Sequence, residues 1–293
     1  MTDTKQTIGW IGAGKMGLPI CMRLQAAGYA VQVLARTAEA KTKLEAAGLI
    51  TKSSITDVCR GANIVFSSIS DDAALQEVVC NAGGVADSLP NGSTYIDIST
   101  VSPEASHHVA QRLQRAGIVY LRSPVSGSTA MAAAGTLTAV VSGSKQNVDE
   151  LASIFAVFAK KIFHVGEGEE ARAMKLVLNS MVAATSALLA EALAFGVKGG
   201  LDIATMLNVV NQSVVASPLI AYKTEMIVSG NYKAAASLAT LKKDLDLLLK
   251  TSATPLPLNA HIHQIYQSAI DHGLAEEDFF VLVRQAQSAG EKL

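Results

Sequence analysis

Two polar residues on one expected helix could carry out proton transfer. Lys175 and Asn179 are four residues apart, so on a helix their side chains lie on the same face. A lysine ammonium can protonate a carbonyl oxygen that gains charge, and the neutral amine can take the proton back in the reverse direction. An isolated lysine on a long helix is more often a solvated charge. The pair by itself leaves both interpretations open.

A glycine-rich turn near the N-terminus indicates a dinucleotide site. It reads G-x-G-x-x-G, follows a β-branched run over 7–11 and opens a helical stretch over 15–27. Such glycines permit a tight turn, let the backbone approach a pyrophosphate and let the helix pack on the strand, while the helix N-terminus attracts anions. The expected cofactor contacts are Gly12, Ala13, Gly14, Lys15, Met16 and Gly17.

The residues after the second expected strand favour NADP over NAD. A NAD-selective site offers an acid there to the ribose 2′-hydroxyl, but this chain has Arg36 and Thr37. Both could hold a 2′-phosphate. The alternative is that Arg36 is an ordinary solvated loop charge. We therefore expect NADP as the cofactor, with NAD as the less favoured one.

Other catalytic arrangements are absent from the sequence. No tyrosine is followed by a lysine four residues later, which argues against a Tyr/Lys acid-base pair. His261 and His263 are two residues apart and would point away from each other on a helix, so we expect no metal site. The three cysteines form no C-x-x-C pair and predict neither a disulfide framework nor a thiolate site.

The elements that must position these residues change character along the chain. The first half alternates short apolar runs with helical stretches, which predicts an α/β fold: a Rossmann-type, doubly wound parallel sheet with helices on both faces. The expected strands cover 7–11, 30–34, 63–69, 94–98, 119–121 and 137–141, and two of the helices between them cover 15–27 and 102–116.

The second half reads as all helical. From 169 to 198 there is no proline and one glycine, which predicts a single helix about 45 Å long that links two domains. We expect an NADP-binding Rossmann domain over 1–165 and an all-helical substrate and oligomerisation domain over 166–293. Further helices are expected over 202–212, 237–251, 258–271 and 276–288.

Composition limits the partners. The net charge is −1 with no dense basic tract, so we expect no nucleic-acid or membrane-surface binding. The apolar stretch over 181–197 is interrupted by Glu191 and is too short for a convincing membrane span. The charged fraction of 17% is low and suggests surface buried between subunits, as in a homodimer or homotetramer. The chain shows no secretory signal, and we expect a cytoplasmic protein.

Five ordered motifs resemble the β-hydroxyacid dehydrogenase family, which includes 3-hydroxyisobutyrate dehydrogenases and tartronate semialdehyde reductases. The resemblance covers nearly the whole chain. It rests on the glycine turn, on D-I-S-T-V-S-P over 97–103, on P-V-S-G-S over 124–128, on the G-x-x-x-K-x-x-x-N-like segment that contains Lys175 and Asn179, and on K-D-L over 243–245.

The resemblance implies roles for these motifs. It makes Lys175 the general acid/base with Asn179 beside it, and it gives Lys243 a contact with the cofactor that closes the cleft; Asp244 ranks lower, as a structural partner. The hydroxyls and backbone N–H groups after a strand would bind a small carboxylate-bearing substrate, and this loop consists of Ser126, Gly127 and Ser128.

Loops at the carboxyl ends of two further strands complete the expected site, because such folds bind ligands at that edge. Ser99 and Thr100 should border the nicotinamide or the substrate. Ile69 and Ser70 should touch the adenosine side, mainly through their backbone.

One departure from the family pattern bears on the substrate. Where members often have D-A-P, this chain has Arg122 followed by Ser123 and Pro124. A guanidinium there could bind a second anionic group of the substrate. It could equally be a change at an interface or behind the site.

The sequence thus predicts reversible hydride transfer between NADP(H) and a short 3-hydroxy acid or its semialdehyde, with alcohol oxidation faster at alkaline pH. The alternatives are an imine-reducing enzyme on the same scaffold and a non-catalytic NADP-binding scaffold protein. A decarboxylating phosphogluconate-type enzyme is disfavoured, since the helical half looks too short and lacks an obvious arginine cluster.

Overall fold

The structure is a computed structural model that describes residues 5–290. Its two units divide inside one long helix, between Lys175 and Leu176. The sequence prediction places the domain boundary earlier, at residue 165, before this helix begins. Each unit has its own apolar core.

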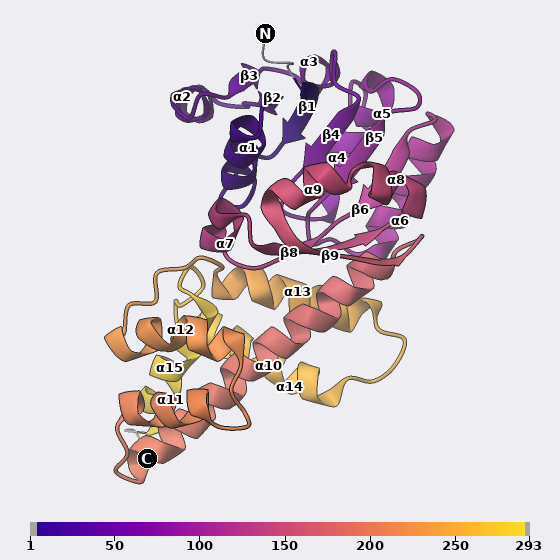
Figure 1. The fold of residues 1–293 in the computed structure, drawn as a ribbon. Helices are drawn as coiled ribbons and strands as arrows, with labels where there is room; N and C mark the ends of the chain where they lie inside the picture. Colours follow the sequence, from indigo (N-terminus) through magenta and orange to yellow (C-terminus); the bar gives the residue numbers. More distant parts are fainter. Residues whose placement is uncertain (1–4, 291–293) are drawn as a thin grey trace. The chain divides into compact units, whose positions relative to one another are not determined.

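The first unit is built on one mixed sheet with strand order β3-β2-β1-β4-β5-β6-β8-β7, and β9 pairs with β8 (Figure 1). The order β3-β2-β1-β4-β5-β6 is that of a Rossmann fold, in which ligands bind where the order reverses between β1 and β4. The strands are β1 (Lys5–Ile11), β2 (Tyr29–Leu34), β3 (Ile50–Lys52), β4 (Ile64–Ser67), β5 (Thr94–Asp97), β6 (Val119–Arg122), β7 (Val125–Ser126), β8 (Leu137–Ser142) and β9 (Ala159–Gly166).

The sheet departs from the all-parallel prediction at one end. The strands β1 to β6 pair in parallel, but β8 is antiparallel to both β6 and β7. The connection from β7 to β8 contains only one short helix, and a parallel pair would need a longer crossover.

Helices cover both faces of the sheet, as predicted. The alternation along β4 shows why: Phe66 packs on one face against Trp10, Phe155 and Phe158, while Val65 belongs to the core on the other face. The helices are α1 (Gly17–Ala26), α2 (Ala38–Ala46), α3 (Ile55–Cys59), α4 (Asp72–Cys80), α5 (Val85–Ser88), α6 (Pro103–Arg115), α7 (Thr129–Ala134), α8 (Lys145–Glu150) and α9 (Ala152–Phe158).

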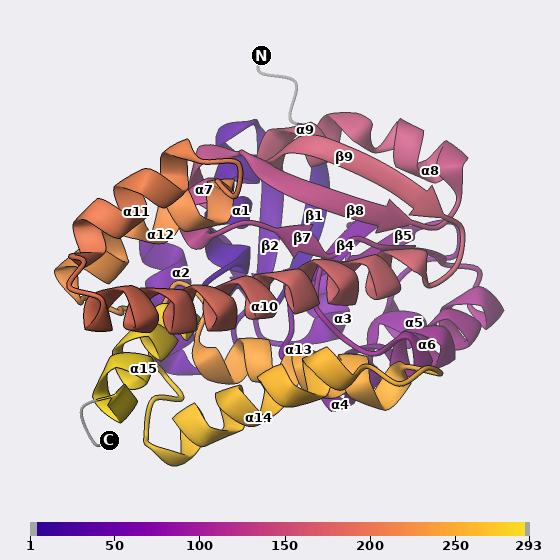
Figure 2. The ribbon, with the colours of Figure 1, turned by 90° about the horizontal axis from the view of Figure 1, so that it is seen from below.

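The second unit is helical, and the predicted long helix is confirmed as α10 (Glu170–Lys198), which begins in the first unit (Figure 2). By length and apolarity α10 could cross a membrane, but core helices pass the same test, and Ala183, Ala187 and Leu193 are buried in this unit's core. The other elements are α11 (Ile203–Gln212), α12 (Pro218–Ser229), α13 (Leu238–Thr251), α14 (Pro257–Asp271), the 3₁₀ turn η1 (Phe279–Val281) and α15 (Leu282–Gly290).

Candidate cofactor and active site

The glycine turn between β1 and α1 has two glycines that the fold requires and one that it does not. Gly12 has φ +85°, and a Cβ there would lie 2.1 Å from the Ser68 carbonyl oxygen. A Cβ on Gly17 would lie 2.6 Å from the Gly12 carbonyl oxygen. A Cβ on Gly14 would meet nothing within 4 Å. The backbone at Gly14 is therefore open to a ligand, as a pyrophosphate site demands.

Helix α1 begins at this turn, and its N-terminus adds a positive electrostatic potential that favours an anion. The Leu18 N–H donates to the Gly14 carbonyl at 3.0 Å, so the helical hydrogen bonds begin inside the turn. The first N–H groups of any helix lack a carbonyl partner within it and carry partial positive charge. The turn thus combines access and charge for a phosphate.

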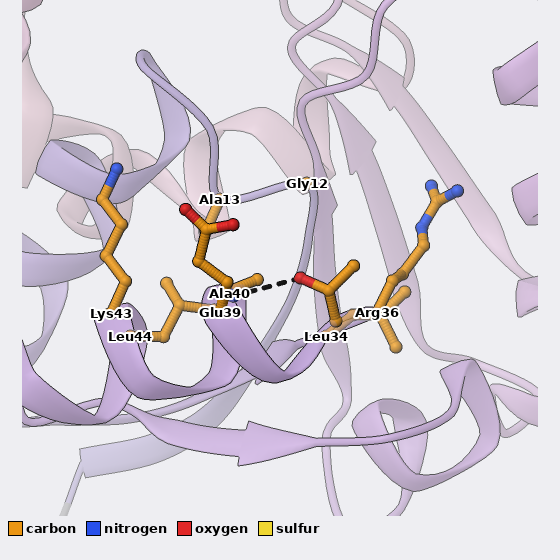
Figure 3. A pocket seen from close by; sticks show the side chains of 9 residues that line it. Gly12, Ala13, Leu34, Arg36, Glu39, Ala40, Lys43 and Leu44 are labelled. Atoms are coloured by element: carbon orange, nitrogen blue, oxygen red, sulfur yellow. Dashed lines mark hydrogen bonds between the residues drawn. The ribbon is translucent and has the colours of Figure 1, made fainter.

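A pocket of about 380 Å³ lies between the glycine turn and the start of α2 (Figure 3). Thr37 caps α2, because its Oγ1 accepts from the Ala40 N–H at 3.1 Å. The pocket's lining includes four of the predicted cofactor residues, namely Gly12, Ala13, Arg36 and Thr37.

Two charged residues of this pocket were not predicted. Glu39 and Lys43 also line it from α2, and in Figure 3 their side chains extend to the same side as that of Arg36. Arg36 Nη1 lies 4.0 Å from Glu77 Oε1, but both side chains are more than half exposed, so this ion pair is weak and can yield to a ligand. Two cations and one acid therefore line the pocket.

The loops after β4 and β5 lie together at the carboxyl edge. The Ile69 N–H donates to Ser99 Oγ at 2.9 Å, and Ser99 Oγ donates to Asp97 Oδ1 at 2.6 Å. Thr100 follows and is half-buried, and Ser70 is exposed. The structure thus brings Ile69 and Ser99 into contact, as the shared edge predicts.

A buried ion pair that no sequence pattern indicated lies next to these loops. Arg172 Nη2 is 2.6 Å from Asp97 Oδ2, and both side chains are fully buried. Burial alone lowers the pKa of Arg172, but Tyr120 and Asp97 outweigh it and raise the pKa above its usual value. Burial also raises the pKa of Tyr95, so its hydroxyl stays protonated and donates to Ser67 Oγ at 2.6 Å.

Lys175, the predicted general acid, lies beside the predicted substrate loop. Lys175 Nζ donates to the Val125 carbonyl at 2.9 Å, and Ser126 is the next residue on β7. Ser128 caps α7 by accepting from the Met131 N–H at 3.3 Å. Gly127 lies between the two serines and is exposed. Both groups belong to the first unit, which also carries the glycine turn.

Asn179 and Lys243 belong to the second unit. There Asn179 Nδ2 donates to Asp244 Oδ2 at 2.5 Å, and Lys243 Nζ is 3.3 Å from Asp244 Oδ1. Asp244 is buried and joins the two polar residues, which agrees with its expected structural role. The contacts of Asn179 and Lys243 with substrate and cofactor stay predictions.

Arg122 is buried, and its fork is directed at a carboxylate. Its Nε and Nη2 donate to Glu169 Oε1 at 3.0 and 2.5 Å, and its guanidinium lies 4.3 Å from the Tyr120 ring centre. Glu169 comes directly before α10. This pairing favours the structural alternative for Arg122 over a contact with substrate.

A Rossmann sheet, an open glycine turn and a lysine beside a serine-glycine loop together define a dehydrogenase that binds a nicotinamide dinucleotide. Family models agree: residues 7–166 match the NAD-binding domain of 6-phosphogluconate dehydrogenase, and residues 169–286 match the NAD-binding domain of NADP-dependent 3-hydroxyisobutyrate dehydrogenase. The chain belongs to the β-hydroxyacid dehydrogenase family of NAD(P)-dependent oxidoreductases.

Two relatives match over nearly the whole chain. The 2-(hydroxymethyl)glutarate dehydrogenase of Eubacterium barkeri is 32% identical over 94% of this chain and 93% of its own. The chloroplastic glyoxylate/succinic semialdehyde reductase 2 of Arabidopsis thaliana is 29% identical over 97% of this chain and 80% of its own. Among solved structures, Psf3 in complex with NADP⁺ and 2-OPP has a TM-score of 0.88 at 26% identity, over 94% of this chain and 99% of that one.

Cofactor and role vary among further relatives. The NAD-dependent L-serine dehydrogenase of Pseudomonas aeruginosa is 28% identical over 94% of this chain and 96% of its own. The human cytokine-like nuclear factor N-PAC is 29% identical over 97% of this chain, which spans about half (52%) of that protein. Family membership therefore fixes NAD(P) binding without fixing which dinucleotide is preferred.

Proposed function

We propose that this protein transfers a hydride reversibly between NADP(H) and a short 3-hydroxy acid or its semialdehyde, of the 3-hydroxyisobutyrate, 2-hydroxy-3-oxopropionate or succinic semialdehyde type. The observation that carries the proposal is the contact between Lys175 Nζ and the Val125 carbonyl. It holds the ammonium beside the loop over 126–128, in the unit that also carries the open glycine turn.

The residues of the chain divide the work. A bound nicotinamide supplies or accepts the hydride. An ammonium has three N–H donors, so Lys175 can keep its bond to Val125 and still donate to a substrate carbonyl oxygen. Ser126 and Ser128 supply hydroxyls, and the exposed Gly127 supplies a backbone N–H, for the substrate carboxylate. The negative charge that develops on the substrate oxygen is then stabilised by the same ammonium that protonates it.

Replacement of the lysine tests the proposal. Lys175→Met should lower kcat at least about a hundredfold, the scale of general acid-base catalysis, with glyoxylate, succinic semialdehyde and tartronate semialdehyde as trial substrates. The matched control is Lys198→Met, an exposed lysine at the end of the same helix. NADPH binding, followed by quenching of the sole tryptophan, Trp10, should not change in either variant.

Four outcomes separate the candidate functions. Turnover of an aldehyde that depends on Lys175 supports the proposal. Normal turnover in Lys175→Met with unchanged cofactor binding contradicts the assigned acid. Cofactor binding by the wild type without turnover of any aldehyde or cyclic imine would favour the non-catalytic alternative, and turnover of imines alone would favour the imine-reducing one.

The preference for NADP is part of the proposal and is supported by the pocket at α2. Arg36 and Lys43 offer two cations to a 2′-phosphate, and Thr37 offers a hydroxyl, whereas Glu39 opposes a phosphate. We expect kcat/KM to be higher with NADPH than with NADH. Arg36→Met should lower the ratio of kcat/KM with NADPH to kcat/KM with NADH, and Glu39→Gln should raise this ratio.

The control for these variants is Lys41→Met. Lys41 lies on α2 but is outside the pocket's lining, and it is 3.9 Å from Glu45. Lys41→Met should leave the ratio of kcat/KM with NADPH to kcat/KM with NADH unchanged. A wild-type enzyme that works better with NADH would refute the preference while leaving the reaction itself intact.

We also propose that the chain forms a homodimer or homotetramer. Helix α10 exposes a stripe at seven-residue intervals, the spacing with which two helices pack along a seam. It consists of Met174, Met181, Leu188 and Phe195, which are 37, 64, 69 and 83% exposed. Leu188→Lys should lower the mass measured by sedimentation equilibrium. A wild-type monomer at micromolar concentration would contradict the assignment.

A further inference from the structure

Arg172 is a fully buried charge beside the candidate site, and every nitrogen of its guanidinium has a partner. It donates to Asp97 Oδ2 at 2.6 Å, to the Ser99 carbonyl at 2.7 Å, to Tyr120 Oη at 2.8 Å and to Ser106 Oγ at 3.2 Å. Burying a guanidinium is costly unless such bonds replace water. This arrangement therefore fixes the side chain in one position.

Asp97, a partner of Arg172, is hydrogen-bonded to the loops after β4 and β5 that are expected to border the cofactor. Asp97 Oδ1 accepts from Ser67 Oγ at 2.5 Å and from Ser99 Oγ at 2.6 Å. Ser99 Oγ in turn accepts from the Ile69 N–H. One continuous set of hydrogen bonds thus joins the ends of β4 and β5 to the first turn of α10.

The lysine proposed as the general acid lies on the next turn of α10. Arg172 and Lys175 are three residues apart on α10, so they are neighbours on its surface. Two other bonds hold residues close by: Glu169 pairs with Arg122, and the Ala171 N–H donates to Ser142 Oγ. Of these three attachments, the one through Arg172 reaches the loops that should border the nicotinamide.

We propose that Arg172 is a positioning residue that sets the place of the Lys175 ammonium relative to the Ser99 loop. The proposal rests on the function proposed above. A planar fork can hold the Asp97 carboxylate and the Ser99 carbonyl at once, and this ties the acid and the nicotinamide-side loop into one rigid piece. Misplacing a reacting group by about 1 Å can cost a hundredfold in rate.

The decisive variant keeps the charge and removes the fork. In Arg172→Lys an ammonium still compensates Asp97, but a single point charge cannot reproduce the separate bonds to Ser99 and Ser106. We expect kcat to fall at least about tenfold, because a reacting group misplaced by about 1 Å can cost up to about a hundredfold in rate. NADPH binding by Trp10 quenching should change much less, since the glycine turn and the α2 pocket are untouched.

The matched control is another buried ion pair far along the chain from the proposed chemistry. Lys223 Nζ is 2.5 Å from Asp278 Oδ2, and both side chains are buried in the second unit. Lys223→Arg should lower the melting temperature without lowering kcat at temperatures where the protein is folded. Arg172→Met, which removes the charge as well as the hydrogen bonds, should lower kcat further than Arg172→Lys.

A readout besides activity separates this inference from the proposed function. After reductive ¹³C-methylation, the NMR signal of Lys175, assigned with Lys175→Met, should move in Arg172→Lys and stay in place in Lys223→Arg. An unmoved signal, or wild-type kcat in folded Arg172→Lys, overturns the positioning role. If the wild type showed no turnover but the Lys175 signal still moved in Arg172→Lys, the proposed function alone would be refuted and the positioning role would stand.

Discussion

Replacement of the second glycine of the turn should separate cofactor binding from folding. Gly14 has no neighbour within 4 Å of an added Cβ, and it is not among the glycines with positive φ. Alanine therefore fits the apo backbone, and Gly14→Ala should leave the free energy of unfolding unchanged or raise it by about 0.4–1 kcal/mol through loss of unfolded-state entropy. The new methyl group would occupy the approach to the pyrophosphate.

The magnitude follows from the bonds that the methyl group would displace. Losing one hydrogen bond to a charged group costs about 1.5–3 kcal/mol, which corresponds to roughly a tenfold to hundredfold weaker Kd for NADPH. The flanking glycines give the opposite result. In Gly12→Ala the strained φ costs about 1–2 kcal/mol, and the overlap with the Ser68 carbonyl adds about 1–3 kcal/mol. Gly17→Ala should also destabilise the protein, because its Cβ would meet Trp10 and the Gly12 carbonyl.

Two measurements on the same samples decide the matter. Urea unfolding of the apo protein gives stability, and quenching of Trp10 by NADPH gives affinity. Gly14→Ala should lose affinity at constant stability, whereas Gly12→Ala should lose stability first. Wild-type affinity in Gly14→Ala would refute the placement of the pyrophosphate at this turn, and equal losses of stability in both variants would refute the packing argument.

Three further predictions concern charge and proton binding. Arg122→Gln removes a largely buried ion pair and should cost about 3 kcal/mol of stability in urea unfolding, while KM for a monocarboxylate substrate should stay within about twofold; a selective rise in KM would restore the substrate role. Burial raises the pKa of the Cys59 thiol from 9.0 to about 12. The folded state therefore keeps a proton that the unfolded state loses, and the free energy of unfolding of wild type relative to Cys59→Ala should fall as pH rises from 9 toward 12; a flat difference would contradict this. Alcohol oxidation should accelerate with rising pH, because a lysine must be neutral to act as a base, and a pH-rate profile of Lys175→Met that keeps this slope would assign the base to another group.

Local sequence patterns were sufficient for most of the fold. Central strands such as β1 and β4 are apolar runs bounded by glycine or polar residues, and their lengths agree with the prediction to within a few residues. The strand β9 was missed because Lys160 and Lys161 interrupt its apolar pattern, and both are exposed. It pairs only with β8 among the described strands, which places it at an edge of the sheet, where lysines are common. The helix α12 was missed although Ser217 and Pro218 form an ordinary helix start.

The candidate site was predictable only where neighbours in sequence are also neighbours in space. The glycine turn and the pair of Arg36 and Thr37 were found because each lies directly after a strand. Glu39 was not predicted because it lies beyond the end of β2, where a NAD-selective site carries its acid. The first turn of α2 brings this carboxylate into the same pocket. A pattern for cofactor preference must therefore include the helix that follows the strand.

Long-range charge pairing lay beyond any local pattern, and it gives a buried partner to Arg122, where the sequence departs from the family motif. Arg122 pairs with Glu169 across 47 residues, and Arg172 pairs with Asp97 across 75. Arg122 without a partner would be an uncompensated buried charge, and Glu169 supplies the carboxylate that compensates it. Both pairs attach the start of α10 to the ends of β6 and β5. Lys175 is therefore held by the unit that carries the glycine turn, even though most of its helix belongs to the other unit.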